Sequence, residues 1–203
     1  MKKVVRRVKQ TISKLKKWSE NFTPLGRVRS RYFWYRDHIS LKEHWVLLES
    51  AKGGYPGDNI AVMLSELASN PQYKEFRLFL AGEETLAKER KEYLKDLGLL
   101  DRVTPLSIGT SFYYKVLATA KYLINDDSFI YLFTKRPGQI YLNLWHGTPL
   151  MTLGRSKKHD HAIIGNEQKN FLTQIGCFVP MNTQESAFWK IIRFPIFPKE
   201  NFG

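Results

Sequence analysis

Apolar and polar positions form short blocks along most of the chain, and these blocks predict strands that alternate with helices. Short apolar runs predict buried strands at residues 45–49, 76–81, 103–107, 122–124 and 139–145. Helices are predicted between them at residues 58–69, 83–97, 111–120 and 128–134. Strands that alternate with helices form a mostly parallel sheet through right-handed crossovers. The expected fold is therefore an α/β domain with a Rossmann-like sheet.

Signals at the ends of these segments support the same division. Asp58 is placed to cap the first helix, and Gly98 is placed to end the second. Beyond residue 146 the pattern weakens, and one more strand is expected within residues 171–180. We expect a basic arm, a Rossmann-like domain and a proline-broken apolar tail, at residues 1–42, 43–193 and 194–203.

The first eighteen residues have the pattern of a basic amphipathic helix. Apolar residues from Val4 onward recur at spacings of three and four, and would share one helical face. Such a helix suits an anionic membrane surface. The residues expected to contact it are Lys2, Lys3, Arg6, Arg7, Lys14, Lys16, Lys17 and Trp18. A solvated tail packed on its own domain and a nucleic-acid-binding arm are the alternatives, but no nucleic-acid-binding motif is found.

The charge of the chain is concentrated at its beginning. The 203 residues carry a net charge of +13, and residues 1–42 contribute 13 basic against 2 acidic side chains. Hydrophobic residues make up 43% of the chain, which excludes a disordered protein, and a single cysteine, Cys177, excludes a disulfide framework. No apolar run approaches the roughly 20 residues that a membrane span needs, and no secretory signal is recognisable. We expect a cytoplasmic protein held peripherally on the inner face of the cell membrane.

A second basic stretch allows two interpretations. Four arginines at positions 27, 29, 31 and 36 are interleaved with four aromatic residues at positions 32–35. Cationic and aromatic side chains together suit the interfacial layer of a membrane. The same residues also suit a connector packed on the domain.

His146 is the main candidate for chemistry. It follows the apolar run at 139–145, and ligands of open parallel sheets bind beyond the carboxyl ends of the strands. Gly147 lets the backbone turn and a ligand approach, and Thr148 and Pro149 suit the start of a helix. A histidine at this position is suited to accept a proton near neutral pH. The alternative is a structural histidine bonded to a loop carbonyl.

Other polar residues follow the same edge of the predicted sheet. Asn125, Asp126 and Asp127 come directly after the strand at 122–124. Two adjacent acids suit a cation, but capping of the next helix is the commoner role. His159 and His161 flank an acid without a third ligand, so no metal site is predicted, and no cofactor is expected.

The chain resembles the CDP-glycerol glycerophosphotransferase family. The six-residue signature Trp-His-Gly-Thr-Pro-Leu at 145–150 carries the resemblance, together with Lys-Arg-Pro-Gly-Gln at 135–139 and the stretch at 117–126. Leu48-Glu49-Ser50 and the loop at 54–59 also resemble the family's first strand and loop. The resemblance implies the acceptor-side half of a GT-B fold, with His146 as the base on the acceptor hydroxyl. Gly147, Thr148, Pro149, Asn59, Asn125 and Asp126 are then acceptor-binding or supporting residues.

The resemblance also implies the partners of the protein. The family transfers glycerol phosphate or ribitol phosphate from a CDP-alditol to a lipid-linked acceptor in teichoic acid or capsule synthesis, and no nucleic acid takes part. Met151 departs from the lysine usual after the signature, and the family's donor-binding half does not fit between residues 165 and 203. We expect the chain to be inactive without a separate C-terminal half or a homo-oligomeric partner. A non-catalytic remnant or membrane-binding module and a fragment of a nucleotide-sugar glycosyltransferase are the alternatives.

Overall fold

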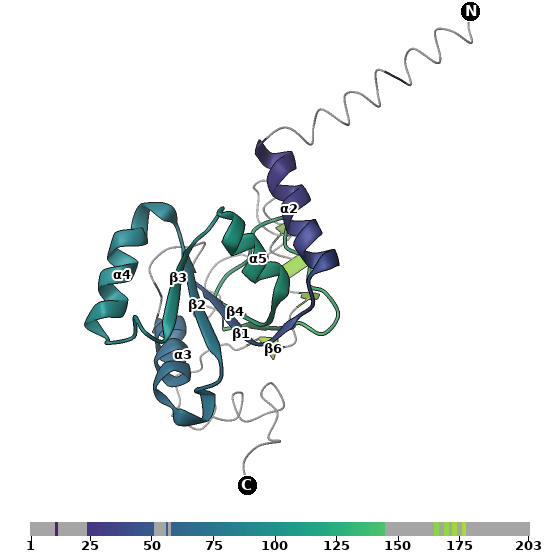
Figure 1. Ribbon diagram of the computed structural model, residues 1–203. Helices are drawn as coiled ribbons and strands as arrows, with labels where there is room; N and C mark the ends of the chain where they lie inside the picture. Colours follow the sequence, from purple (N-terminus) through teal and green to yellow (C-terminus); the bar gives the residue numbers. More distant parts are fainter. Residues whose placement is uncertain are drawn as a thin grey trace, which may run out of the picture.

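Six parallel strands form the centre of the domain (Figure 1). The computed structural model describes residues 11, 24–50, 56 and 58–144, and within 165–177 the pairs 165–166, 169–170, 172–173 and 176–177. The strands lie in the order β3-β2-β1-β4-β5-β6. They are β1 (Lys42–Glu49), β2 (Arg77–Gly82), β3 (Val103–Ser107), β4 (Ala120–Asn125), β5 (Ile140–Asn143) and β6 (Gly176–Cys177). All five strand pairs are parallel, so the expected Rossmann-like sheet is confirmed.

Helices cover both faces of the sheet. They are α2 (Pro24–His38), α3 (Asp58–Ser69), α4 (Ala87–Asp96) and α5 (Ser111–Thr119). Alternate residues of a strand point to opposite faces. Val46 and Leu48 therefore pack with α3 and α4, whereas Leu47 packs with α2 and α5. This double burial explains why the strands read as continuous apolar runs.

The predicted boundaries agree closely with the structure at several places. The strand at 103–107 has the predicted ends, and Gly98 has a φ of 67° after α4, as expected of a glycine that ends a helix.

The short helix predicted at 128–134 is wrong. Tertiary partners take the backbone N–H groups there, because Asn170 Oδ1 accepts from Phe129 N and Tyr32 Oη accepts from Thr134 N.

Helix α2 contains the second basic stretch and packs on the domain. Tyr32 is fully buried beside α5, and its hydroxyl donates to the carbonyl of Thr134. Tyr35 Oη lies 2.8 Å from Ser111 Oγ at the start of α5 and is hydrogen-bonded to it. A packed connector is therefore present at 24–38. The division of the chain after residue 42 stays a prediction, and the amphipathic helix predicted before Trp18 lies outside the described residues.

The Lys-Arg-Pro-Gly-Gln segment holds the amino edge of the sheet, at the start of β5. Gln139 Nε2 donates to the carbonyls of Leu117 and Ala120, 3.1 and 2.9 Å away. Arg136 Nη1 donates to the carbonyl of Ile39, which follows α2. Gly138 has a φ of 86°, and a Cβ there would lie 2.8 Å from Leu41 Cδ1. These residues, which carry part of the family resemblance, therefore have a structural role: they connect the segment after α2 and the end of α5 to the start of β5.

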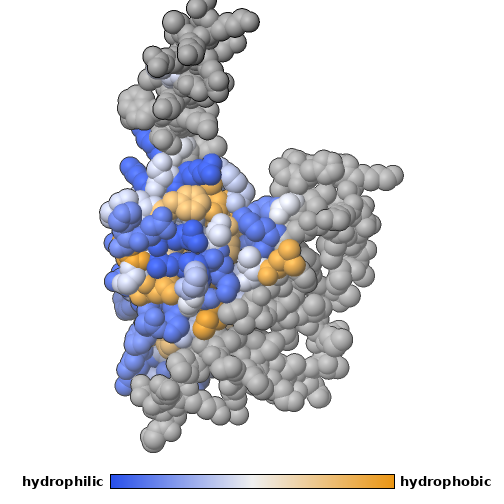
Figure 2. Space-filling view, turned by 90° about the vertical axis from the view of Figure 1, so that its right-hand side faces the viewer, coloured by the Kyte–Doolittle hydropathy of each residue, from blue (hydrophilic) through white to orange (hydrophobic). Residues whose placement is uncertain are grey.

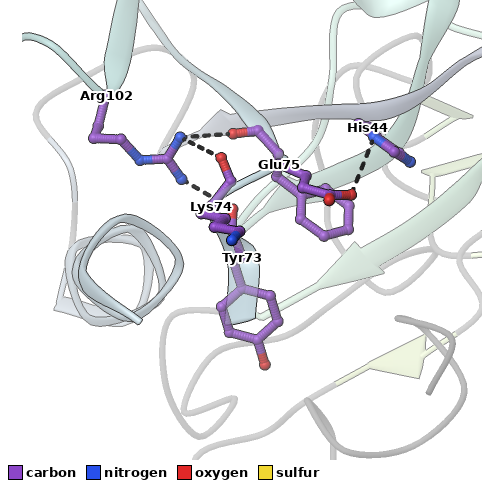
Figure 3. A network of polar contacts seen from close by, with 6 residues as sticks. His44, Tyr73, Lys74, Glu75 and Arg102 are labelled. Carbon is purple, nitrogen blue, oxygen red and sulfur yellow. Dashed lines mark hydrogen bonds and ion pairs between the residues drawn. The ribbon is translucent and has the colours of Figure 1, made fainter. Parts of the chain in front are cut away.

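A second polar cluster lies at the same amino edge, before β2 and β3 (Figure 3). Arg102 donates to three backbone carbonyls, those of Tyr73, Lys74 and Phe76, at 2.9 to 3.1 Å. His44 Nδ1 lies 4.0 Å from Glu75 Oε2. One guanidinium therefore satisfies the carbonyls of the turn that leads into β2.

Replacing Arg102 by alanine is expected to destabilise the domain by about 2 kcal/mol, because three carbonyl acceptors lose a charged donor. Urea unfolding of Arg102→Ala measures this effect. Lys91→Ala, a change at an exposed position of α4, is the control and should stay within about 0.5 kcal/mol of the parent. Equal unfolding midpoints for the two variants would contradict the structural role of Arg102.

Candidate active site at the carboxyl edge of the sheet

A row of polar side chains crosses the carboxyl ends of three neighbouring strands. Glu49 of β1 pairs in register with Asn125 of β4, and Asn125 pairs with Asn143 of β5. Paired residues of parallel strands point to the same face, which here is the face covered by α5. All three side chains are at most 2% exposed. Burial of three polar groups in one row is unusual in a domain core and marks this edge as a candidate site.

Glu49 is the titratable group at the centre of this row. Tyr113 of α5 donates a hydrogen bond from its hydroxyl to Glu49 Oε2 over 2.8 Å. The pKa of Glu49 is raised from 4.5 to about 8, chiefly by burial; the bond from Tyr113 lowers this pKa, and the charges of Asp126 and Asp127 add to the rise. The Glu49 carboxyl is therefore mostly protonated and neutral at pH 7.

The position of Tyr113 follows from the local sequence of α5. The Thr110 side chain accepts a hydrogen bond from Tyr113 N and so caps the start of the helix. This cap fixes the first turn of α5 over the end of β1. Burial and the neighbouring Glu49 raise the pKa of Tyr113, so its hydroxyl stays protonated and serves as a donor.

Asn125 occupies the middle of the row and has one donor without a partner. Its Oδ1 accepts from the Tyr141 hydroxyl over 3.0 Å, whereas no described residue accepts from its Nδ2. Burial raises the pKa of Tyr141, which keeps this hydroxyl protonated as well. Buried polar groups are nearly always hydrogen-bonded. The Asn125 amide is therefore suited to donate to a ligand oxygen.

The loops after β1 and β4 are held together by a side-chain hydrogen bond. Ser50 Oγ donates to Asp126 Oδ2 over 2.7 Å, and both residues are at most 2% exposed. Asn143 Nδ2 donates to the carbonyl of Asp127 over 2.7 Å. Capping of the helix expected at 128–134, the alternative role for Asp126, is wrong because residues 128–134 are not helical. The acceptor-binding role of Asn125 and Asp126 stays a prediction.

Asn59 connects the start of α3 to the end of β5. Its Nδ2 donates to the carbonyl of Leu144 over 3.4 Å, and Leu144 N donates to the carbonyl of Asn125 over 2.7 Å. Leu144 precedes His146 by two positions in the sequence. The structure thus brings Asn59, Asn125 and Asp126 to one edge. His146, Gly147, Thr148 and Pro149 lie outside the described residues. The predicted membrane-binding residues also lie outside them, and these are Lys2, Lys3, Arg6, Arg7, Lys14, Lys16, Lys17 and Trp18.

A buried cation lies farther along the same edge. Arg90 of α4 is 3% exposed, and its Nη1 donates to the carbonyl of Glu83 after β2. Its Nη2 lies 3.4 Å from Ser107 Oγ at the end of β3. Burial lowers the pKa of Arg90, and Glu84 raises it. This guanidinium joins the ends of β2 and β3 and makes the carboxyl edge polar across most of its width.

Several residues of this edge were not recognised as site residues from the sequence. The sequence does contain a signal that could have identified Glu49, because an acidic residue at the end of an apolar strand is unusual. Asn143 had the same signal inside the apolar run at 139–145. Tyr113 and Tyr141 had none, because each is one of several aromatic residues in a buried segment, and only the packing of α5 on the sheet shows which hydroxyl reaches the row.

Two features are absent from the described residues. Among them, no group of three His, Cys, Asp or Glu side chains is arranged to hold a metal ion. Within the same part of the chain, no helix has the length and apolar character needed to cross a bilayer.

Known proteins resemble this chain in sequence and in fold. The family model for CDP-glycerol:poly(glycerophosphate) glycerophosphotransferases matches residues 30–189. A comparison with curated protein sequences gives no match. A histidine-to-alanine variant of the wall teichoic acid polymerase TagF has a TM-score of 0.61 and 16% identity, over 85% of this chain and 42% of that one. The TagF structure without a stated substitution has a TM-score of 0.53 and 17% identity, over 76% and 35%.

The fold likeness extends to a TagF structure with a soaked compound. A histidine-to-asparagine variant soaked with CDPG has a TM-score of 0.52 and 15% identity, over 92% of this chain and 39% of that one. At these identities the likeness shows the fold alone. The chain spans less than half the length of the polymerase chains it matches.

Proposed function

The chain belongs to the family of CDP-glycerol:poly(glycerophosphate) glycerophosphotransferases, and from this we propose that it is the acceptor-side part of such an enzyme. The acceptor is a lipid-linked polyol phosphate, and the donor is CDP-glycerol. The observation that carries this proposal is the meeting of Asn59, Asn125 and Asp126 at the carboxyl edge, directly before the sequence that contains His146.

The proposed reaction is a phosphoryl transfer. The His146 imidazole accepts the proton of an acceptor hydroxyl, and the hydroxyl oxygen bonds to the glycerol-bearing phosphorus of CDP-glycerol. The bond between that phosphorus and the CMP oxygen breaks, so a phosphodiester forms and CMP leaves. General-base catalysis of this kind contributes about 10²- to 10⁴-fold to a rate. Positioning of the acceptor supplies a further part.

The buried polar row gives the acceptor a polar surface. The Asn125 amide and the Asp126 carboxylate are a donor and an acceptor of hydrogen bonds, which suits the hydroxyls of a polyol. Gly147, Thr148 and Pro149 continue the same edge in the sequence. The neutral Glu49 adds no negative charge at pH 7, and this favours the approach of an acceptor that itself carries phosphate.

The donor side of the reaction lies beyond this chain. Because the chain corresponds to less than half of the TagF-like fold, we propose that turnover needs the remaining part, in the same polypeptide or in a partner. The amphipathic segment at residues 2–18, at the start of the basic arm at 1–42, holds the protein at the inner face of the membrane, where a lipid-linked acceptor would lie. Each lysine or arginine near an anionic surface contributes about 1 kcal/mol to such binding.

The proposal is tested by following acceptor binding and CMP formation separately. In NMR titrations, the isolated chain is expected to bind a glycerol-phosphate acceptor analogue. In an activity assay, the same chain is expected to release no CMP from CDP-glycerol. When the donor-binding part is supplied as a fusion, CMP and phosphodiester are expected to form in equal amounts. Absence of acceptor binding would favour a non-catalytic module instead. Release of CMP by the isolated chain would show that its donor site is already complete.

A further inference from the structure

Helix α2 has an inner face that fixes its orientation on the domain. Tyr32 is fully buried, and its hydroxyl hydrogen-bonds to both the N–H and the carbonyl of Thr134. The hydroxyl of Tyr35 is bonded to Ser111 of α5. The helix is therefore held both by Thr134, in the segment between β4 and β5, and by α5. Its other face points away from the domain in a defined direction.

The outer face carries a stripe of cationic and aromatic residues. Arg27, Arg31, Trp34 and His38 are separated by four, three and four positions, which places them along one side of a helix. All four are exposed. We refer to these four residues as the α2 stripe.

Helix α2 differs in net charge from α4, which also carries many exposed charged side chains. Helix α2 contains four arginines and one acidic residue, Asp37, which is also exposed. On α4 the exposed charges balance, since Lys88, Lys91 and Lys95 are matched by Glu89, Glu92 and Asp96. The outer side of α2 is thus a cationic surface, whereas that of α4 is neutral as a whole.

Trp34 gives the stripe an aromatic centre. It is 53% exposed, and its ring stacks on the ring of His38 with centroids 4.9 Å apart and planes 11° apart. Figure 2 views the right-hand side of Figure 1 and shows hydrophilic and apolar side chains mixed over the described part of that face. The α2 stripe itself offers cationic groups and aromatic rings for a contact.

We propose that the α2 stripe docks onto an anionic lipid surface. Trp at the level of the headgroups, flanked by arginines that contact lipid phosphates, is the combination typical of an interfacial contact. This inference rests on the membrane association proposed above, and it adds a contact on the folded domain itself. Because α2 is fixed on α5, the contact also sets how the domain is oriented on the membrane.

The experiment is sedimentation of the full chain with vesicles of equal parts phosphatidylglycerol and phosphatidylcholine, and with vesicles of phosphatidylcholine alone. Arg27→Gln/Arg31→Gln is expected to weaken binding to the anionic vesicles by roughly 10-fold or more, given the contribution of each arginine. Lys91→Gln/Lys95→Gln removes two exposed charges at the same spacing from α4 and is expected to bind like the parent. Trp34→Ser is expected to weaken binding several-fold, and thermal melting checks that each variant is folded.

A third pair of substitutions separates this inference from the proposed role of the arm. Arg6→Gln/Arg7→Gln tests the arm alone. If this variant loses vesicle binding while Arg27→Gln/Arg31→Gln matches the α4 control, the α2 stripe is not a docking surface and the arm alone binds. If Arg27→Gln/Arg31→Gln binds as the parent does, the inference is wrong whatever Arg6→Gln/Arg7→Gln shows, and if the parent itself does not bind the anionic vesicles, the membrane association is wrong as well. Loss of DNA binding with unchanged vesicle binding in Arg27→Gln/Arg31→Gln would assign the stripe to nucleic acid and overturn the inference.

Discussion

A His146→Ala chain, joined to a donor-binding part, is expected to form CMP from CDP-glycerol about 10²- to 10⁴-fold more slowly than the parent. The physical reason is that alanine cannot accept the proton of the acceptor hydroxyl, which is a poor nucleophile while it is protonated. The loss is expected in kcat, with little change in KM for either substrate, because the imidazole acts in the transition state rather than in binding. Steady-state rates of CMP release and of phosphodiester formation, measured at varied concentrations of each substrate, give kcat and the KM values.

The matched control for this experiment is His44→Ala. His44 lies at the opposite, amino edge of the sheet beside Glu75, so its replacement is expected to leave the rate of CMP formation unchanged (Figure 3). A structural His146 would behave differently, because its loss would lower the melting temperature and reduce kcat only as far as folded protein is lost. A His146→Ala enzyme with a parental melting temperature and a parental rate would exclude the base role.

Glu49→Gln is expected to stabilise the domain increasingly as the pH rises from about 5 to about 8.5. The unfolded chain loses the Glu49 proton near pH 4.5, whereas the folded chain keeps it to about pH 8. The contribution of Glu49 to the free energy of unfolding is therefore fully present below pH 4.5, the pKa in the unfolded chain. It is lost as the pH rises through about 8, the pKa in the folded chain. At 1.36 kcal/mol per pKa unit, a rise from 4.5 to about 8 makes the loss on the order of 5 kcal/mol above pH 8. Glutamine carries no titrating proton, so the variant is spared this loss.

Urea unfolding of the parent and of Glu49→Gln at pH 5, 7 and 8.5 measures the effect. The difference in the free energy of unfolding between the two proteins is expected to be small at pH 5 and largest at pH 8.5. Tyr113→Phe is the companion variant. It removes the hydrogen bond that lowers the pKa of Glu49, so the fall in stability of this variant is expected to extend to higher pH. A difference between parent and Glu49→Gln that is the same at all three pH values would contradict the buried, protonated state of Glu49.

The sequence predicted the sheet well because both of its faces are buried. Strands covered on both sides need continuous apolar runs, and such runs stand out at 45–49, 76–81 and 139–145. The strand at 103–107 was placed correctly although it contains a proline, since Pro105 lies on the edge strand of the sheet. The failure at 128–134 has the opposite cause. That segment hydrogen-bonds to Tyr32 and Asn170, which are distant in sequence, and local periodicity carries no information about such partners.

The second basic stretch shows why one pattern allowed two interpretations. The packed connector is confirmed, and the interfacial contact stays a proposal. The residues at 27–36 suit a packed connector and an interfacial segment. In the structure, Tyr32 and Tyr35 face α5, whereas Arg31 and Trp34 are exposed. The mixed composition reflects two faces of one helix, and only packing on α5 shows which residue belongs to which face.

The sequence by itself determined the fold class and the family, and it predicted the edge of the sheet at which the candidate site lies. These follow from local properties: the apolar runs, the signature at 145–150, and the rule that ligands of parallel sheets bind at the carboxyl ends of strands. Only the tertiary structure decided that Glu49 is held by Tyr113, that Asn125 has a donor without a partner among the described residues, and that the α2 stripe faces outward. Each of these depends on residues far apart in the chain, and the pKa of a carboxyl depends on the burial and the charges that such residues create around it.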